Sequence, residues 1–465
     1  MYKKQHIHFV GIGGIGMSGL AQVLLTLGYS VSGSDLRSTM ITKGLASRGA
    51  SIYQGHRPEN IIGADVVVVS SAVKQDNPEL VAARAADIPI IPRAEMLGEL
   101  MRFKKFGVAV AGAHGKTSTT SMIASVFQAA DLDPTVIIGG QVKGLGTNAY
   151  WGKGDFLVAE ADESDGSFLR LTPSIVVVTN IDREHLDFYS NIDEIKENFA
   201  KFMEKIPFYG VVIACGDDPI VRDVLSYNRK RHIIYGTGDN AELKACCIRT
   251  NKKMGISFGV EQHGAFLGKI NLTVPGIHHV RNALAAVALG LELELDFHTI
   301  RKGLEAYTGV GRRFEILGVE RGITVVDDYA HHPTEIRATL EAARQIWPDR
   351  RIVVLFEPHR YSRTQALMEE FATCFDLADV LWLTEIYPAS EKPIVGVSGQ
   401  RLARFIKDKT GHSVHFVDNV RAFPEAVASF LKDGDVVFTM GAGAIGKIGP
   451  KIVQMIRGER VAAVF

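Results

Sequence analysis

The most informative segment of this chain runs from Val108 to Ile123 and reads VAVAGAHGKTSTTSMI. Its apolar start predicts a buried parallel strand, its glycines predict a tight turn, and its hydroxyl-rich remainder predicts the start of a helix. Such a turn directs several backbone N–H groups, and the positive end of the helix dipole, at one point. A Gly-rich surface turn with an incidental lysine is the alternative.

We expect this turn to bind a nucleoside triphosphate. Lys116 can place a positive charge on the terminal phosphates, and the Thr117 hydroxyl can ligate Mg²⁺. The spacing is not that of the strict eight-residue phosphate loop, because Val110 stands where the first glycine would be.

The pattern on both sides of this segment is strand, turn and helix, which predicts an α/β protein. We expect three consecutive α/β domains: a Rossmann-like N-terminal domain (1–104), a P-loop-type central ATPase domain (105–310) and a Rossmann-like C-terminal domain (311–465). Parallel sheets are predicted, and the turn at 309–311 resembles a hinge. The predicted strands are 8–10, 29–33, 66–69, 88–91, 156–159, 175–178, 211–214, 324–326, 351–356, 380–383 and 436–439, and the main helices of the central part are 281–291 and 299–307.

The composition sets limits on the class of protein. A length of 465 residues, with 46% hydrophobic and 22% charged residues, is ordinary for a globular protein of two or three domains. The 52 basic and 52 acidic side chains balance, so no global field attracts nucleic acid or an anionic membrane. The four cysteines have no metal-site spacing, and no segment resembles a signal peptide or a membrane span. We expect a cytoplasmic enzyme with free thiols, either a monomer or a weak homodimer.

Near the N-terminus, the glycines of the motif Gly11-x-Gly13-x-x-Gly16 follow a strand, and Asp35 ends the next one. This arrangement fits the dinucleotide fingerprint. Its physical requirement is only a close approach of the backbone to a diphosphate, which NAD or any other nucleoside diphosphate satisfies. A purely structural turn is the remaining alternative.

In the central part, polar residues follow two of the predicted strands. Glu160 begins an acidic run, and His185 lies in the segment after the next strand. Parallel strands present ligands at their carboxyl ends, so Thr117, Glu160 and His185 could hold one or two divalent ions. The alternatives are a solvated acidic loop and a capping or core histidine. Asn282 is open between a helix cap and an amide that reads adenine.

The C-terminal part carries two polar clusters directly after strands, at 327–335 and 357–364. Arg360 and Arg363 are three residues apart, so one helical turn would place both guanidinium groups on one face to clamp a carboxylate. We expect a pocket for a small anion such as an amino acid. A surface ion-pair network is the alternative.

Taken together, these motifs resemble the Mur ligases, the ATP-dependent amino-acid ligases of peptidoglycan precursor synthesis. The segments that carry the resemblance are 111–117, the Glu160 segment, 180–185, the His278/Asn282 segment and Arg312-Arg313-Phe314-Glu315, and the three-domain order covers the whole chain. The GxGGxG motif, 327–333 and 359–363 resemble the branch that attaches L-alanine to UDP-N-acetylmuramate.

The resemblance implies ATP and Mg²⁺ as cofactors, UDP-N-acetylmuramate and L-alanine as substrates, and an acyl phosphate intermediate. The implied UDP-sugar ligands are Gly11, Gly13, Gly14, Ile15, Gly16, Ser34, Asp35, Ser70 and Ser71. The implied ATP ligands are Gly112, Ala113, His114, Gly115, Lys116, Thr117, Ser118, His278, Asn282 and Asp328. Thr117, Glu160 and His185 are the implied metal ligands, and Lys116, Glu160, His185 and Arg313 the implied catalytic residues. Tyr329, His331, His359, Arg360 and Arg363 would surround the amino acid.

Two positions stand apart from this resemblance. Ala444 lies where we expect an acid, which puts only a minor C-terminal contact in doubt. Several relatives use a carboxylated lysine near the metals, and Lys201 lies in that region, but we assign it no such role.

Three other functions are compatible with parts of the sequence. An NAD-dependent oxidoreductase would explain Gly11 to Asp35 but not the second nucleotide loop. A nucleotide-driven switch protein would explain Lys116 and Thr117 but not an amino-acid-sized pocket. Within the family, a ligase that recycles a whole tripeptide is the nearest rival, and the run from His359 to Arg363 favours the small amino acid.

Overall fold

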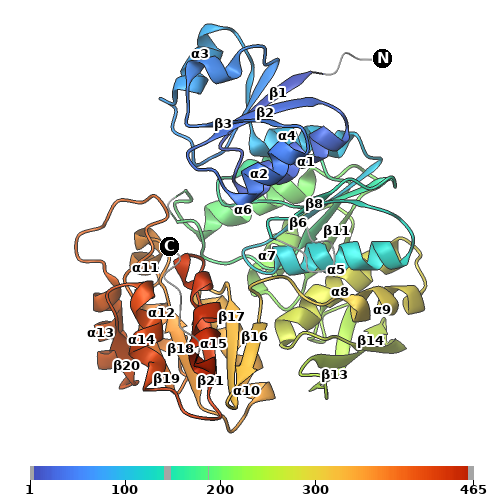
Figure 1. Ribbon diagram of the computed structural model, residues 1–465. Helices are drawn as coiled ribbons and strands as arrows, with labels where there is room; N and C mark the ends of the chain where they lie inside the picture. Colours follow the sequence, from blue (N-terminus) through green and yellow to red (C-terminus); the bar gives the residue numbers. More distant parts are fainter. Residues whose placement is uncertain (1–4, 141–147, 187, 459–465) are drawn as a thin grey trace.

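The computed structural model describes residues 5–140, 148–186 and 188–458. Three sheets follow one another along the chain, each covered by helices (Figure 1). The expected three-part α/β architecture is confirmed. We call the parts built on these sheets the N-terminal, central and C-terminal domains, while the exact boundaries given above stay predictions.

The N-terminal domain is a five-stranded parallel sheet in the order β3-β2-β1-β4-β5. Its inner strands are largely buried because both faces of the sheet are covered by helices. Its strands are β1 (His6–Val10), β2 (Ser30–Asp35), β3 (Ser51–Gln54), β4 (Val66–Val69) and β5 (Ile90–Pro92). Its helices are α1 (Ile15–Thr26), α2 (Met40–Ser47), the 3-10 turn η1 (Pro58–Ile61), α3 (Pro78–Ala85) and α4 (Arg93–Arg102).

The central domain has a ten-stranded sheet in the order β15-β14-β13-β12-β11-β10-β6-β9-β7-β8. Its strands are β6 (Phe106–Ala111), β7 (Thr135–Ile137), β8 (Ala149–Tyr150), β9 (Phe156–Glu160), β10 (Ile175–Val178), β11 (Val211–Cys215), β12 (His232–Gly236), β13 (Leu243–Thr250), β14 (Ile256–Gln262) and β15 (Ala265–Asn271). Its helices are α5 (Lys116–Ala129), η2 (Ser167–Arg170), α6 (Ile192–Glu204), α7 (Pro219–Tyr227), α8 (Ile277–Glu292) and α9 (Phe297–Ala306). The expected strands are present, but β7, β8, β12 and the antiparallel β13-β14-β15 extension were not predicted.

The C-terminal domain has a six-stranded sheet in the order β16-β17-β21-β18-β19-β20. Its strands are β16 (Glu315–Glu320), β17 (Ile323–Asp328), β18 (Ile352–Phe356), β19 (Val380–Leu383), β20 (Val414–Phe416) and β21 (Val436–Met440). Its helices are α10 (Pro333–Ile346), α11 (Tyr361–Ala366), α12 (Met368–Thr373), α13 (Gly399–Thr410), η3 (Val420–Ala422), α14 (Phe423–Ala428), η4 (Ala444–Lys447) and α15 (Gly449–Arg457). The expectation of a wholly parallel sheet is wrong at one edge, where β16 runs antiparallel to β17.

Strand register brings the polar motifs together. Ala111 pairs with Val178, and Val110 pairs with Glu160, so the carboxyl ends of β6, β9 and β10 lie at one edge of the central sheet. In the C-terminal domain, Asp328 and Phe356 both pair with Met440, which places the segments after β17, β18 and β21 at one edge. These are the positions at which open α/β sheets bind ligands.

The hydrophobic clusters join two of the domains, whereas the third domain has clusters of its own. One cluster runs from the N-terminal sheet into the central domain and includes Phe9, Leu100, Phe168 and Phe199. The C-terminal domain packs two clusters of its own, which begin at Phe314 and Ile323. All four cysteines are free, as expected. No helix among the described residues combines the length and the apolarity that crossing a bilayer requires.

Candidate active site

The turn between β6 and α5 is held in a fixed shape by neighbouring side chains. Gly112 has a φ of 138°, and a Cβ added there would collide with Thr179 and the Asn180 backbone. The His114 N–H donates to Asn180 Oδ1 (2.8 Å), and the His114 carbonyl accepts from Asn180 Nδ2 (2.9 Å) and the Thr179 hydroxyl (2.6 Å). The loop therefore lies at the N-terminus of α5 in the arrangement that suits a phosphate.

Lys116 begins α5 and points back into this loop. Its ammonium group donates to the Gly112 carbonyl (2.6 Å) and to both carboxylate oxygens of Glu163 (2.8 Å each). Burial opposes the charge, but Glu163 and Asp162 outweigh it and raise the pKa of Lys116. Glu163 also lies 3.5 Å from His185 Nε2. Glu163 was not among the predicted site residues, although it belongs to the acidic run that starts at Glu160.

The predicted metal ligands lie around this lysine. Burial raises the pKa of Glu160, and hydrogen bonds from the Thr117 hydroxyl and the Gly139 N–H (3.0 Å) act in the opposite direction. Thr117 and Glu160 are therefore neighbours, whereas His185 joins the group through Glu163. A hydroxyl and carboxylates form the oxygen-rich donor set that Mg²⁺ prefers, so these residues fit the ion that we expect.

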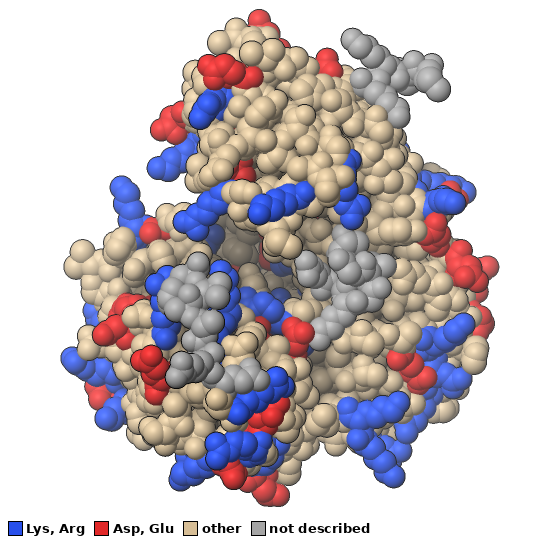
Figure 2. All heavy atoms as spheres, in the orientation of Figure 1, with Lys and Arg blue, Asp and Glu red and all other residues tan. Residues whose placement is uncertain are grey.

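A cavity of about 300 Å³ opens beside the loop, between the central and C-terminal domains. Figure 2 shows the surface hollowed at the centre of this face, where the three domains meet. Predicted site residues that line the cavity are His114, Gly115, Thr117, Ser118, His278, Asn282, Arg313 and Asp328. Its volume lies at the small end of the range for ligand pockets.

Two residues of α8 lie at this cavity. The helix begins at Ile277, so Asn282 is within it and the helix-cap alternative is wrong. The Asn282 amide lies against Gly115, where an added Cβ would come within 2.8 Å of Oδ1. His278 is in its neutral form because burial holds its pKa well below the usual value, and its buried Nδ1 atom has no hydrogen-bond partner. That nitrogen is therefore available to a ligand.

The opposite wall has an ion-pair network that the sequence analysis missed. His114 Nε2 lies 3.0 Å from Asp182, and Nδ1 lies 3.4 Å from Glu335. Burial disfavours the charge, but these carboxylates raise the pKa of His114 to about 10, so the ring is an imidazolium at neutral pH. Glu335 also accepts from Arg313 Nη1 (3.4 Å) and the His331 N–H (3.1 Å). Glu335 thus links His114 of the phosphate loop to Arg313 and His331 of the C-terminal domain.

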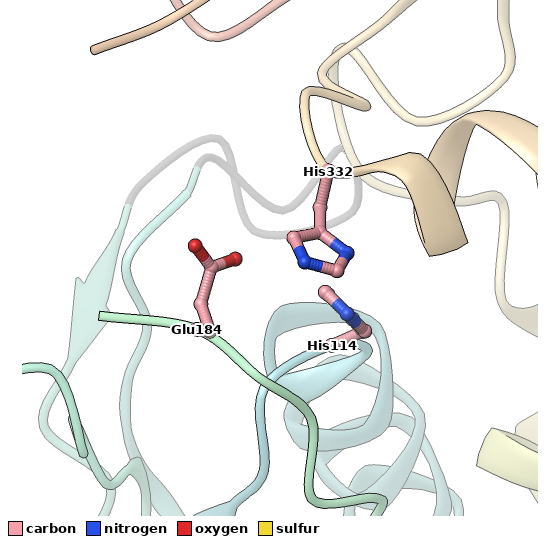
Figure 3. A group of neighbouring side chains, drawn as sticks. All are labelled: His114, Glu184 and His332. Carbon is pink, nitrogen blue, oxygen red and sulfur yellow. The ribbon is translucent and has the colours of Figure 1, made fainter. Parts of the chain in front are cut away.

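Figure 3 shows a second group on this wall: His114, Glu184 and His332. One ligand atom from each lies within 4.8 Å of the others. His332 Nδ1 accepts from the Thr334 N–H (3.3 Å) at the start of α10, and its buried Nε2 has no partner. Both ring nitrogens of His114 already face carboxylates, and Glu184 binds Arg363, so the group is part of the ion-pair network in this structure.

The residues predicted to bind the amino-acid substrate lie next to this network, on the side of the C-terminal domain. The rings of Tyr329 and His331 are 5.4 Å apart, and those of His331 and His359 are 5.6 Å apart. Burial lowers the pKa of His331 to about 4 and that of His359 to about 3, so both are neutral. Arg363 Nη1 donates to the His359 carbonyl (2.9 Å). The structure therefore brings four of the five predicted residues into one cluster.

The expected pairing of Arg360 and Arg363 on one helix face is wrong. Arg360 precedes α11 with a φ of 73° and lies 3.9 Å from Glu391, whereas Arg363 lies inside the helix and donates to Glu184. Both arginines nevertheless line one small cavity together with Glu184.

The N-terminal loop is assembled as its glycines predict. Gly11 has a φ of 84°, Gly14 caps α1, and the Gly13 N–H donates to Asp35 Oδ2 (2.9 Å). The Gly11 and Ile12 N–H groups donate to the Ser34 carbonyl, and a Cβ at Gly11 would come within 3.3 Å of Ser70 Cβ. The Ser34 side chain is buried and donates to Glu79 (2.6 Å), so Ser34 supports the loop through its backbone. Ile15, Gly16 and Ser71 stand at or near the same turn, and Arg93 lies against Gly16.

The structure also shows the surroundings of Lys201 and Ala444, the two positions that stand apart from the family resemblance. Lys201 is largely exposed on α6 and lies 3.6 Å from Glu197. At Ala444, where an acid was expected, the Ala444 and Ile445 N–H groups instead donate to Glu357, whose pKa burial raises to about 7.

Comparisons with known proteins place all three domains in one family. Residues 6–105 match the model described as "Mur ligase family, catalytic domain", residues 110–290 match "Mur ligase middle domain", and residues 312–443 match "Mur ligase, glutamate ligase domain".

A UDP-N-acetylmuramate–L-alanine ligase of Desulfotalea psychrophila is 55% identical over 460 residues, which is 99% of this chain and 100% of that protein. The crystal structure of a UDP-N-acetylmuramate–alanine ligase from Thermotoga maritima aligns with a TM-score of 0.83 at 31% identity, over 98% of this chain and 99% of the other. A murein peptide ligase from Psychrobacter arcticus aligns with a TM-score of 0.72 at 25% identity, over 99% and 100% of the two chains.

Proposed function

The chain belongs to the Mur ligase family, and we propose that it joins the carboxylate of UDP-N-acetylmuramate to the amino group of L-alanine at the expense of ATP. This is the activity named for the relative that is 55% identical over 99% of the chain. The enzyme is an acid–amino-acid ligase of peptidoglycan precursor synthesis, and an NAD-dependent oxidoreductase has no support from these relatives.

One observation carries the reaction class. The cavity beside the phosphate loop has walls from the central domain, including Gly115 and Thr117, and from the C-terminal domain, including Arg313 and Asp328. A nucleotide bound there has its phosphates at the loop and the C-terminal domain above them. A simple nucleotide switch does not need this second wall, whereas a ligase needs it to present the second substrate.

The first chemical step is phosphoryl transfer. A carboxylate oxygen of the muramyl lactyl group attacks the γ-phosphorus of ATP, the bond to the bridging oxygen breaks, and ADP leaves with an acyl phosphate formed. Both reacting groups are anionic, so positive charge must be supplied. Lys116 lies at the loop, and Arg313, held by Glu335, faces the same cavity from the other domain.

The second step forms the amide bond. The neutral amine of L-alanine attacks the acyl carbon, and inorganic phosphate leaves from the tetrahedral intermediate. Each domain supplies one reactant in this scheme: the UDP-sugar on the Gly11–Gly16 loop, ATP on the loop before Lys116, and L-alanine on the C-terminal cluster. Holding three reactants in one geometry provides the entropic advantage of an intramolecular reaction.

Mg²⁺ is the expected metal. Thr117 and Glu160 would hold it, and His185 lies close enough, through Glu163, to contribute to the same region. When bound, the ion neutralises charge on the phosphate oxygens.

The choice of L-alanine over a tripeptide is supported by the relatives. Those named as alanine ligases are 55% and 31% identical to this chain, whereas the murein peptide ligase is 25% identical.

The proposal is tested with ¹⁸O in the muramyl carboxylate. One labelled oxygen should appear in the inorganic phosphate released, because that oxygen bridges to phosphorus in the acyl phosphate. ADP formation should require the sugar nucleotide, and its steady rate should require L-alanine. Unlabelled phosphate, or ADP release with neither substrate, contradicts the scheme.

A further inference from the structure

Glu184 is a buried carboxylate at the junction of two sites. It follows β10 in the central domain, and its Oε1 accepts from Arg363 Nε of the C-terminal domain at 2.8 Å. Both side chains are less than a tenth exposed. The catalytic scheme above gives Glu184 no task, although a charge buried between two domains is costly unless it has partners.

Glu184 lies beside a positive charge in this position. The guanidinium group of Arg363 is 2.8 Å from its carboxylate, and both side chains are largely excluded from solvent. The site therefore presents a buried carboxylate that needs a cationic partner.

The same carboxylate lines the small cavity that we assign to the amino acid. Its wall includes Arg360 and Arg363 on the C-terminal side and Glu184 and His185 on the central side. Two guanidinium groups and one carboxylate match the charges of a zwitterion, because the arginines suit an α-carboxylate and the glutamate suits an α-ammonium group. A ligand with only an anionic group would compete with Glu184 for Arg363 and would leave the buried carboxylate without a cationic partner.

The position of Glu184 also determines how a bound amino acid is oriented. Its carboxylate lies near His114 of the phosphate loop and His332 at the N-cap of α10, with ligand atoms of the three residues within 4.8 Å (Figure 3). A group held by Glu184 therefore lies between the arginines and the loop at which the acyl phosphate forms. The amine of the amino acid must occupy such a place to attack the acyl carbon.

We propose that Glu184 binds the α-ammonium group of the incoming amino acid and so selects an amino acid over acids that lack this group. The inference rests on the proposed ligase function and names a specificity residue for its third substrate. In this arrangement Arg360 and Arg363 hold the carboxylate, and Glu184 orients the nitrogen toward the phosphate loop. The ammonium group gives one proton to solvent before the neutral amine attacks the acyl carbon.

The size of the cavity adds a requirement. It measures about 20 Å³, which is room for about one water molecule. Its walls come from both domains, so L-alanine enters while residues 183–186 and 360–367 are further apart and is enclosed when they approach. The ion pair between Glu184 and Arg363 is then replaced by two ion pairs to the zwitterion.

The test compares L-alanine with L-lactate, which has the same shape and carboxylate but a neutral hydroxyl group in place of the ammonium group. The enzyme is wild type or Glu184→Gln, with ATP and UDP-N-acetylmuramate saturating. The KM for L-alanine should rise roughly 10- to 100-fold in the variant, as for loss of a hydrogen bond to a charged group. The inhibition constant of L-lactate should change less than about threefold, so discrimination between the two acids falls by about the same factor as the KM rises.

A purely structural role for Glu184 predicts a different result. If the glutamate only positioned Arg363, both acids would lose their carboxylate clamp and weaken together, and that outcome overturns the proposal. An unchanged KM for L-alanine overturns it as well.

Two controls separate these outcomes from other failures. Glu370→Gln removes a carboxylate from a different contact between the central and C-terminal domains, the exposed pair with Arg183 (3.5 Å), and should leave both constants unchanged. Transfer of ¹⁸O within ATP in the presence of the sugar nucleotide alone reports acyl phosphate formation, which should persist in Glu184→Gln and shows that the variant is folded. If wild type itself fails this exchange, the ligase function fails rather than the role of Glu184.

Discussion

The two junctions of the central domain differ in kind. Toward the N-terminal domain, α4 packs on η2 and strand β6, and one hydrophobic cluster continues across the junction from Phe9 to Phe199. Toward the C-terminal domain, the described contacts are mostly polar: His114 with Glu335, Thr334 with Asp182, and Arg363 with Glu184. None of the clusters found among the described residues spans that second junction.

This difference assigns separate tasks to the junctions. Burial of apolar surface is non-directional and is lost when surfaces separate, so the first junction holds the N-terminal and central domains together as one body. Ion pairs and a solvent-accessible cavity cost less to separate, so the second junction can open to admit substrates and close for chemistry. The reactive groups lie at the junction that can move.

The strongest prediction concerns the apolar junction. Phe168→Ala removes a fully buried ring from the shared cluster, where it packs on Phe199 and Phe202 at 5.3 and 4.6 Å. We expect a loss of about 3–5 kcal/mol in the free energy of unfolding. In calorimetry the N-terminal and central domains should melt together at a lower temperature, while the C-terminal transition stays in place.

Phe371→Ala is the matched control, because this ring is equally buried but belongs to the C-terminal core. It should lower only the C-terminal transition. A single transition that both variants shift alike would show that the two junctions do not differ in the way described.

The next prediction concerns chemistry rather than stability. Lys116→Ala removes the cation at the phosphate loop, and we expect turnover to fall by two to three orders of magnitude, about 2.7–4 kcal/mol, as for loss of an electrostatic catalytic donor. Unfolding temperatures should change little compared with Phe168→Ala. Turnover near that of wild type, measured as ADP release with all three substrates, removes Lys116 from the mechanism.

A third prediction uses pH to weaken the polar junction. The pKa of His114 is raised to about 10 by Asp182 and Glu335, against burial, while the unfolded value is about 6.5. Because the folded pKa is the higher one, the stabilisation is complete below about pH 6.5 and is lost as the pH rises toward 10. We expect a loss of about 1.5–3 kcal/mol, the contribution of a hydrogen bond to a charged group.

The measurement is the C-terminal unfolding transition followed from pH 7 to pH 10. It should fall in wild type and should be nearly flat in His114→Gln, which has no imidazolium to lose. The shared transition of the other two domains should follow this profile only in part, because Asp182 but not Glu335 belongs to the central domain. Equal slopes in both proteins would mean that His114 does not hold the junction.

The smallest effect is expected at the rim of the same junction. Arg183 and Glu370 form an exposed pair at 3.5 Å, and such pairs contribute about 0.2–1 kcal/mol. A double-mutant cycle with Arg183→Ala and Glu370→Ala should give a coupling energy in this range that 0.5 M salt removes. A larger, salt-insensitive coupling would indicate that the rim, and not the buried network, holds the domains together.

The sequence predicted strand ends well because their signal is local. Glu160 and Asp35 could be placed from apolar runs that stop at a polar residue, and the loop before Lys116 follows the same rule. Strands β13 and β15 were missed because they are partly exposed, so their residues do not form the continuous apolar runs that mark a buried parallel strand. Strand β14 is buried over its first five residues, but Ser257 and Gly259 interrupt its apolar run.

The partners of the site residues could not be predicted in the same way. Glu163, Asp182, Glu184 and Glu335 act because folding carries them to a lysine, a histidine or an arginine far away in the chain, for example over 179 residues for Glu184 and Arg363. Nothing local distinguishes these acids from the others. The left-handed backbone of Arg360, which takes it out of α11, likewise has no sequence signal, since such a conformation is uncommon outside glycine.

The bracing of the phosphate loop by Thr179 and Asn180 has a consequence for how fast a nucleotide can be captured. The N–H and carbonyl groups of His114, in the middle of the loop, are already held by the strand end next to them. The entropy cost of ordering these groups is incurred when the chain folds. An arriving triphosphate therefore binds to a preformed loop, and its binding need not wait for a rearrangement of the loop. The slow event in each cycle should then be the approach of the C-terminal domain.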